Sequence, residues 1–229
     1  MSLALHYHPL ASFCHKVLIA LYENDTPFEA RVVDFADPGD SARFLELWPV
    51  GKIPVLRDDA RDRTVPETSV IIEYLARHHP GPVPLLPAEP DARLEVRLWD
   101  RFFDAYVQVP MQKIVVDRLR PEGAADPHGV AEARDGLCTA YDTLDRRLAE
   151  AGEWIVGEDF SMADCAAAPA LFYAGIVEPF ADSHPAIDAY FERLLARPSV
   201  ARTLREARPH FVNFPYREAM PKRFLEPAD

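Results

Sequence analysis

The sequence predicts two domains: a mixed α/β domain over residues 1–80, and an all-helical domain over residues 91–229 that ends in an irregular tail. Three observations lead to this prediction. Apolar residues alternate with a period of two, as in strands, only before residue 80. After residue 90 they recur every three or four positions, as on a helix face. Five prolines in residues 80–90 predict a stiff linker over residues 81–90, because proline neither continues a helix nor donates to a central strand.

The first domain begins with a strand, a helix and a second strand. Residues 3–7 alternate large apolar side chains with alanine and histidine, as in a strand with one buried face. Residues 14–21 space their apolar side chains three and four apart, which predicts a helix that ends near residue 24. Residues 30–33 predict the second strand.

The rest of this domain predicts a helix, a hairpin and a final helix. Residues 41–48 are a short helix candidate. Residues 53–57 and 64–65 flank a polar tip and therefore predict an antiparallel hairpin. Helical spacing returns from residue 67 and stops at Pro80. The resulting order is β-α-β-α-β-β-α, and a right-handed crossover between its first two strands gives a four-stranded mixed sheet.

The second domain is predicted to be a helical bundle. Its apolar stripes are Leu94, Leu98, Phe102, Ala105 and Val109; Leu137, Tyr141, Leu144 and Leu148; an alanine-rich run after Asp164; and Ile187, Tyr190, Phe191, Leu194 and Leu195. We expect the first stripe to face the core, with a kink at Pro110. Ser161 and Asp164 have the spacing of a capping box, for which we expect a structural role.

Composition and charge restrict the partners and the location. The 229 residues are 48% hydrophobic and 27% charged, enough to bury a core without disulfides or a structural metal. Acidic residues (37) outnumber Lys and Arg (25), and the formal net charge of -12 repels nucleic-acid phosphates and anionic lipid headgroups. We therefore expect no nucleic-acid partner and no membrane partner. Three cysteines without a CxxC spacing, and the lack of a signal-peptide pattern, favour a cytoplasmic location.

Three motifs occur in a fixed order along the chain. They are Gly51-Lys52-Ile53-Pro54-Val55-Leu56, Glu67-Thr68-Ser69-Val70-Ile71-Ile72-Glu73-Tyr74-Leu75 and Phe160-Ser161-Met162-Ala163-Asp164. Together with the predicted order of elements, they make the chain resemble a cytosolic glutathione S-transferase up to about Arg208. The resemblance implies a thioredoxin-like first domain, glutathione as co-substrate, a homodimer and a role in detoxification.

The Ile53-Pro54 pair is the first predicted contact with glutathione. A proline that heads a strand can be an ordinary trans residue of an edge strand, but an X-Pro bond in a tight turn can be cis. The resemblance implies the cis form, which presents the main chain of Ile53 to the cysteinyl unit of glutathione, as in strand addition. Lys52 is the predicted partner of the glycyl carboxylate, with Lys16 and His15 as alternatives.

Glu67 and Thr68 are the predicted contacts for the other end of glutathione. They lie where a strand gives way to a helix, and the free N–H groups at a helix start bind carboxylates. On local sequence alone, Thr68 or Ser69 could simply cap that helix while Glu67 is solvated. The resemblance implies instead that Glu67 and Thr68 bind the γ-glutamyl end, which carries an ammonium and a carboxylate on one carbon.

The resemblance also implies a side-chain donor, just after the first strand, that stabilises the thiolate of glutathione. Ala11 stands where many members of the family place serine or cysteine. Ser12 is the first candidate, although its hydroxyl could instead cap the helix, and Tyr7 is the second, although it could belong to the core. Cys14 would support a different enzyme, a glutathione-dependent thiol reductase, unless it is a buried and inert thiol. Because of Ala11, a non-enzymatic binding or regulatory protein is a further alternative.

The second substrate is expected to be a small apolar electrophile that binds between the domains, against the long helix after the linker and the C-terminal tail. The candidate lining residues are Phe103, Tyr106 and Phe214, followed by Gln108, Phe211 and Tyr216. The eight histidines show no ligand spacing and no Gly-rich phosphate loop occurs, so no metal and no nucleotide cofactor is expected.

Overall fold

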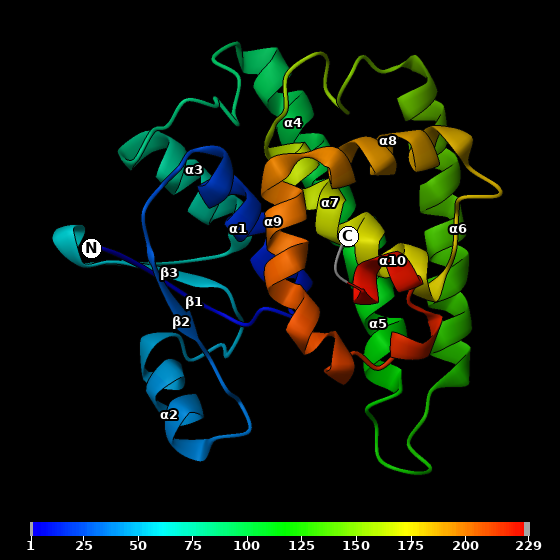
Figure 1. Cartoon of the computed structure of the whole chain (residues 1–229), viewed down its shortest axis with the longest axis horizontal. Coiled ribbons are helices and arrows are strands. Elements are labelled where there is room, and N and C mark those ends of the chain that lie inside the picture. Colours follow the sequence, from blue (N-terminus) through cyan, green and yellow to red (C-terminus); the bar gives the residue numbers. More distant parts are fainter. Residues whose placement is uncertain (1, 227–229) are drawn as a thin grey trace.

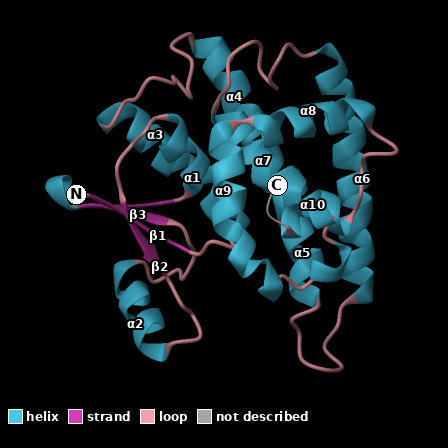
Figure 2. Cartoon of the chain, viewed as in Figure 1, coloured by secondary structure: helices cyan, strands magenta, loops and turns pink. Residues whose placement is uncertain are grey.

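The first domain is a four-stranded mixed sheet with helices on both faces (Figures 1 and 2). The computed structural model describes residues 2–226. The elements of this domain follow the predicted order and are β1 (Leu3–Tyr7), α1 (Ser12–Glu23), β2 (Glu29–Val32), α2 (Pro38–Leu47), β3 (Val55–Asp58), β4 (Arg63–Pro66) and α3 (Thr68–His78). The predicted fold class of the first domain is confirmed.

The strands run in the order β2-β1-β3-β4. β1 pairs in parallel with β2, with Leu5 opposite Ala30, because the helix between them carries the chain back to the same end of the sheet. β3 pairs antiparallel with both β1 and β4, so Leu56 lies opposite Leu5 on one side and Val65 on the other. A short 3-10 turn, Asp59–Arg61, closes the hairpin between β3 and β4.

Both faces of β1 are covered, although the alternation predicted one buried face. Leu3 and Leu5 pack in one apolar cluster with side chains of α1 and α3, while His6 lies against Phe44 of α2. Figure 1 shows α1 and α3 above the sheet and α2 below it. Ala4 is buried as well. The prediction failed here because Ala4 differs from the neighbouring leucines in size but not in polarity, so the alternation did not mark a solvent-exposed face.

The second domain is helical, as predicted. Its α-helices are α4 (Pro90–Phe102), α5 (Val109–Asp117), α6 (Pro127–Glu150), α7 (Met162–Val177), α8 (Pro185–Ala196), α9 (Pro198–Ala207) and α10 (Lys222–Leu225). A π-helical turn, Phe103–Gln108, joins α4 to α5, and the tail adds the 3-10 turns Arg208–Asn213 and Arg217–Ala219. Sequence analysis did not identify α9. None of the helices within residues 2–226 has both the length and the hydrophobicity that a bilayer crossing requires.

Helix α7 lies at the centre of the second domain. It packs against α1, α4, α5 and α8, and all of its residues except Gly175 are buried, as its alanine-rich sequence predicts. At its start, Asp164 accepts hydrogen bonds from Ser161 N at 2.8 Å and Tyr190 Oη at 2.6 Å. Ser161 and Asp164 together make the reciprocal contacts of a capping box. Burial raises the pKa of the Asp164 carboxyl above its ordinary value.

The predicted stripe of α4 faces outward instead of into the core. Leu94 is 61% exposed and Leu98 is 58% exposed, whereas Val96 and Trp99 are buried. Pro110 lies in the first turn of α5, directly after the π-helical turn. The prediction was wrong because three polar residues lie on the buried face and find partners across the domain boundary. These residues are Asp100, Asp104 and Gln108.

Candidate functional site

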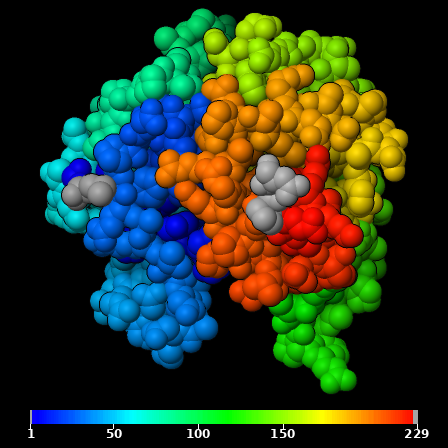
Figure 3. Space-filling model, in the orientation of Figure 1, coloured from blue at the N-terminus to red at the C-terminus, as the bar shows by residue number. Residues whose placement is uncertain are grey.

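Two cavities lie side by side between the domains. The first measures about 690 Å³ and is called the polar cavity here; its polar lining residues include Lys52, Glu67, Thr68, Ser69, Arg101 and Asp104. The second measures about 610 Å³ and is called the apolar cavity; it is lined chiefly by Leu10, Val33, Met111, Val115, Leu119 and Phe214. Ala11, Phe35, Ile53 and Gln112 line both cavities, so the two meet there. Figure 3 shows the surface hollowed between the light-blue α2 segment and the orange and red tail.

The main chain of Ile53 is open to a ligand where the cavities meet. The Ile53–Pro54 peptide bond is cis. Ile53 precedes β3, whose paired residues begin at Val55, and no backbone hydrogen bond of Ile53 is formed within the described residues. An unpaired N–H and C=O beside a sheet can bind an extended peptide.

The start of α3 forms the opposite end of the polar cavity. Glu67 is the N-cap residue and has φ of 67°, in the left-handed region that non-glycine residues rarely adopt. Its side chain makes no capping hydrogen bond, so the first N–H groups of α3 have no side-chain partner. Thr68 is the first helical residue rather than the cap, and Ser69 is bound elsewhere. This helix start therefore presents free donors and a nearby acid to the polar cavity.

A buried ion cluster, made by Lys16, Ser69, Asp100 and Asp104, supports that helix start. Lys16 Nζ lies 2.7 Å from Asp100 Oδ1 and 2.8 Å from Asp104 Oδ2, and it donates to Ser69 Oγ at 3.0 Å. Ser69 Oγ in turn donates to Asp100 Oδ2 at 2.6 Å. Burial raises the pKa of Asp104, and the nearby Lys16 ammonium opposes that rise. The cluster joins α1, α3 and α4.

Of the three basic residues considered for the glycyl carboxylate, the structure brings Lys52 alone to the polar cavity. Lys16 is 1% exposed, because its ammonium is held in the ion cluster. His15 is buried too, with Nε2 at 2.6 Å from Pro9 O, and burial lowers its pKa to about 4. The alternatives Lys16 and His15 therefore lie outside this cavity.

The three thiolate-activating candidates occupy very different places. Ser12 lines the apolar cavity next to Ala11 and accepts a hydrogen bond from Gln108 Nε2. It does not cap α1, because Ala11 is the N-cap residue and has no side-chain capping bond. Tyr7 lines neither cavity, because it shares the face of β1 that packs on α1 and α3. Burial raises the pKa of the Tyr7 phenol.

Cys14 lies away from both cavities. Its side chain is fully buried on the core face of α1, and burial raises the pKa of its thiol to about 12. A thiol in this setting stays protonated and inert near neutral pH. This position contradicts a role for Cys14 as an exchanging thiol.

Only part of the predicted lining of the second-substrate cavity is in place. Phe214 lines the apolar cavity, but Phe103 is fully buried in the helical core and Tyr106 is 61% exposed outside the cavity. Phe211 and Tyr216 are buried in the core cluster. The predictions for Phe103 and Tyr106 were wrong because, in the π-helical turn after α4, the first of these aromatic side chains belongs to the core and the second lies on the outer face.

The lining residues that sequence analysis missed come mainly from α5. Met111, Val115 and Leu119 recur every four positions, a helical stripe that the sequence contained after Pro110. His8 also lines the apolar cavity, and its Nδ1 accepts from Leu10 N at 3.1 Å. Within residues 2–226, no group of three His, Cys, Asp or Glu side chains converges as metal ligands would.

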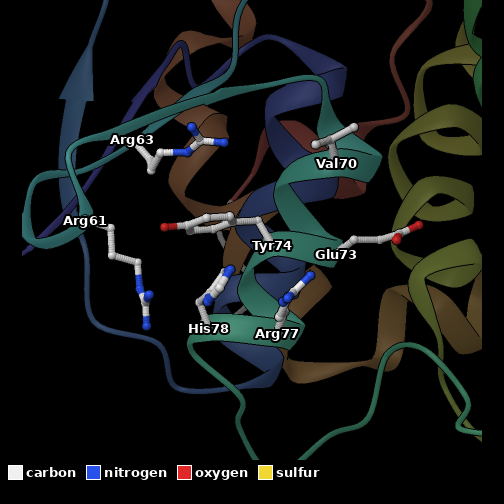
Figure 4. A pocket seen from close by; sticks show the side chains of 7 residues that line it. All are labelled: Arg61, Arg63, Val70, Glu73, Tyr74, Arg77 and His78. Atoms are coloured by element: carbon white, nitrogen blue, oxygen red, sulfur yellow. The ribbon is translucent and has the colours of Figure 1, made fainter.

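A separate concavity of about 550 Å³ lies on the outer face of α3 and β4 (Figure 4). Arg61, Arg63 and Arg77 line it around the ring of Tyr74. Within the described part of the chain, Arg63 and Arg77 form no ion pair. None of the residues predicted to contact glutathione lies in this concavity.

Two family profiles match the chain. The profile described as glutathione S-transferase, N-terminal domain, matches residues 11–78, and the profile described as glutathione S-transferase, C-terminal domain, matches residues 107–198. A glutathione S-transferase of Pseudomonas putida is 30% identical over 162 residues, which cover 71% of this chain and 70% of that protein. The glutathione S-transferase GstB of Escherichia coli is 28% identical over 192 residues, which cover 82% of this chain and 91% of GstB.

Solved structures of similar proteins agree with these matches. A glutathione S-transferase from Methylobacillus flagellatus with GSH bound is 26% identical and has a TM-score of 0.80, covering 88% of this chain and 98% of that one. A glutathione S-transferase from Methylobacterium radiotolerans, in complex with glutathione sulfonate, is 29% identical with a TM-score of 0.75 and covers 88% of this chain and 93% of that one.

Proposed function

Because the chain belongs to the glutathione S-transferase family, we propose that it binds glutathione in the polar cavity and joins the glutathione sulfur to an electrophile held in the apolar cavity. The observation that carries this proposal is the meeting of the two cavities at Ala11 and Ile53. A tripeptide whose central residue pairs with Ile53 has its thiol at the boundary between a polar and an apolar compartment. That is where a reaction between a peptide thiol and an apolar molecule has to take place.

The three parts of glutathione fit three parts of the polar cavity. The γ-glutamyl carboxylate binds the free N–H groups at the start of α3 and the Thr68 hydroxyl, while Glu67 binds the ammonium on the same carbon. The cysteinyl unit pairs with the main chain of Ile53. The glycyl carboxylate lies at Lys52.

The thiol of bound glutathione is activated by Ser12 and by the uncapped start of α1. Lowering a thiol pKa from about 8.5 to about 6.5 requires about 2.7 kcal/mol of preferential stabilisation of the thiolate. A hydroxyl hydrogen bond to an anion supplies about 1.5 to 3 kcal/mol, and a helix N-terminus adds about 0.3 to 1 kcal/mol. Ser12 and the N-cap residue Ala11 bring both effects to the cavity boundary.

The chemistry then needs no further protein group. The thiolate sulfur forms a bond to an electrophilic carbon, and the leaving group departs with its electron pair. In an addition to a conjugated double bond, the adjacent carbon takes a proton from water instead. The chiefly apolar lining by Val33, Met111, Val115 and Phe214 favours a neutral electrophile with an aromatic or alkyl body.

A pH titration of bound glutathione tests this function. The thiolate absorbance is followed in the wild type and in Ser12→Ala, with Tyr7→Phe and Cys14→Ala as controls that remove a hydroxyl or a thiol outside the cavities. We expect a lowered thiol pKa in the wild type and in both controls, and a higher one in Ser12→Ala. A wild-type value equal to that of free glutathione would favour the non-enzymatic alternative. Disulfide reductase activity that disappears in Cys14→Ala would favour the reductase.

We also propose that the protein forms a homodimer through the outer face of α3 and α4. The exposed apolar side chains of these helices and of the π-helical turn after α4 are Val70, Leu94, Leu98 and Tyr106. Arginines of the α3 and β4 concavity offer charges that acidic residues of a second copy can pair. Light scattering tests the proposal on a Leu94→Lys, Leu98→Lys double variant, with Val212→Lys, which is 65% exposed on the tail, as the matched control. We expect monomers in the double variant alone, and dimers that persist in it contradict the proposed interface.

A further inference from the structure

Gln108 reaches from the second domain to the Ser12 hydroxyl of the first. The side chain of Gln108 is 2% exposed, and its Nε2 donates a hydrogen bond to Ser12 Oγ. The amide oxygen of Gln108 is buried and has no hydrogen-bond partner within the described residues. A buried amide oxygen without a partner opposes stability. Gln108 is therefore poorly explained as a residue that serves stability alone.

The direction of this hydrogen bond determines what Ser12 can do. A serine hydroxyl carries one proton and accepts through its oxygen lone pairs. Because Gln108 donates to that oxygen, the Ser12 proton is left for another acceptor, and residues 2–226 provide none. Ser12 lines the apolar cavity beside Ala11, where the two cavities meet. A thiolate at that boundary is an acceptor for the free proton.

The π-helical turn sets Gln108 in register with Ser12. Lys16 and Ser12 lie four residues apart on α1, and Asp104 and Gln108 lie four residues apart in the turn Phe103–Gln108. Lys16 is bound to Asp104 at 2.8 Å, and Ser12 is bound to Gln108. The two contacts lie one helical turn apart, and each connects the first domain to the second. Turns of π-helix inside α-helices are rare and occur often at functional sites.

We propose that Gln108 is a positioning residue that holds the Ser12 hydroxyl so that its proton faces the sulfur of bound glutathione. This inference rests on the proposed function, since it assumes that Ser12 stabilises the thiolate. Gln108 does not touch the sulfur in this arrangement. By donating to Ser12 Oγ, Gln108 fixes the rotamer of the serine side chain. The hydroxyl proton can then be donated only toward the bound sulfur.

The test is the pH titration of glutathione bound to the full-length chain with Gln108→Met, which keeps the length of the side chain and removes the donor. We expect the pKa of bound glutathione to rise by about 1, as for the loss of one neutral hydrogen bond. The Kd of S-methylglutathione, which has no ionisable thiol, stays within about twofold in the same variant. In a Ser12→Ala background, Gln108→Met has no further effect.

A second variant, Gln108→Glu, replaces the donor by an acceptor of the same shape. The carboxylate takes the Ser12 proton for itself, so the pKa of bound glutathione rises again. Gln112→Glu is the matched control for the added charge. Gln112 lies one turn later, lines both cavities and makes no hydrogen bond to Ser12. The rise in Gln108→Glu should exceed the rise in Gln112→Glu.

The outcomes separate this inference from the proposed function. A wild-type thiol pKa equal to that of free glutathione overturns both. A lowered wild-type value that rises in Ser12→Ala but not in Gln108→Met overturns the role of Gln108 and leaves that of Ser12. A rise in Gln108→Met that persists in the Ser12→Ala background shows that Gln108 does not act through Ser12. If Gln108→Met does not fold, as judged by circular dichroism, Gln108→Glu against Gln112→Glu decides the question.

Discussion

Replacing Lys16 by methionine should destabilise the protein strongly and in a pH-dependent way. Lys16 is the cation of the buried ion cluster, at 2.7 Å from Asp100 and 2.8 Å from Asp104. Methionine keeps the unbranched chain of lysine up to the ε position, so the loss of the charged ammonium is the main change. Removing one partner of a buried ion pair costs about 3 to 5 kcal/mol, because the remaining charge is left without compensation. Arg101, at 3.3 Å from Asp104, offsets part of this cost, so we expect about 3 kcal/mol above neutral pH.

The pH dependence follows from the carboxylates that are left behind. Burial already raises the pKa of Asp104, and Lys16 opposes that rise. Without Lys16 the pKa of Asp104 in the folded state rises further. The cost of the uncompensated charge is fully present above that folded-state pKa, and it disappears as the pH falls through it, because protonation neutralises the carboxylate. The difference between wild type and Lys16→Met should therefore shrink from pH 8 to pH 5.

Equilibrium unfolding in urea at pH 8 and at pH 5 measures the free energy of unfolding of the wild type and of Lys16→Met. The variant with Lys16→Met, Asp100→Asn and Asp104→Asn is the control, because it removes the cation and both charges together. We expect this triple variant to recover much of the lost stability, as neutral replacements of whole ion clusters often do. A loss below about 1 kcal/mol in Lys16→Met, or a loss of the same size at both pH values, would refute the reasoning.

Three further predictions follow from buried titratable groups. Asp164→Ala should lower the free energy of unfolding by about 2 kcal/mol through the loss of the capping box, while the Kd of glutathione stays unchanged. Urea unfolding measures the stability, and titration calorimetry measures the Kd. In the native protein one thiol, that of the exposed Cys138, should react quickly with a thiol reagent, and Cys14 and Cys165 should react only after denaturation; three fast thiols would contradict this. Burial lowers the pKa of His15 in the folded protein from 6.5 to about 4. As the pH falls from about 6.5 to about 4, His15 is therefore protonated in the unfolded chain but not in the folded one, and the free energy of unfolding should fall by up to about 3 kcal/mol. His15→Gln should flatten this fall in a series of unfolding curves.

Sequence analysis predicted the elements of the first domain and the ends of the polar cavity, because both depend on local patterns. Ile53-Pro54 and Glu67-Thr68 lie at the junctions of predicted elements, and a junction fixes where the main chain is open to a ligand. The expectation that glutathione binds at these junctions came from the resemblance. The elements between them followed from periodicity alone.

The remaining features could not be predicted because they depend on contacts between distant segments. The buried face of α4 and of the π-helical turn after it carries Asp100 and Asp104. Both side chains are polar, and they can be buried there because the Lys16 ammonium pairs with them. The link between Ser12 and Gln108 spans 96 positions of the chain. Tyr7 was a candidate because it ends the first strand, close to where the resemblance implies a tyrosine hydroxyl, but the alternation of β1 directs its side chain to the face that packs on α1 and α3.

Helix α1 is part of the first domain in sequence, but its side chains are buried against both domains. Every residue from Cys14 to Leu21 is buried, because α1 packs against the sheet on one side and against α7 and α9 on the other. A chimera that combined the first half of this chain with the second half of a relative would have to match side chains all around this helix. The two halves are therefore expected to be inherited and to change together, and a recombination point in the linker would separate partners that fit only each other.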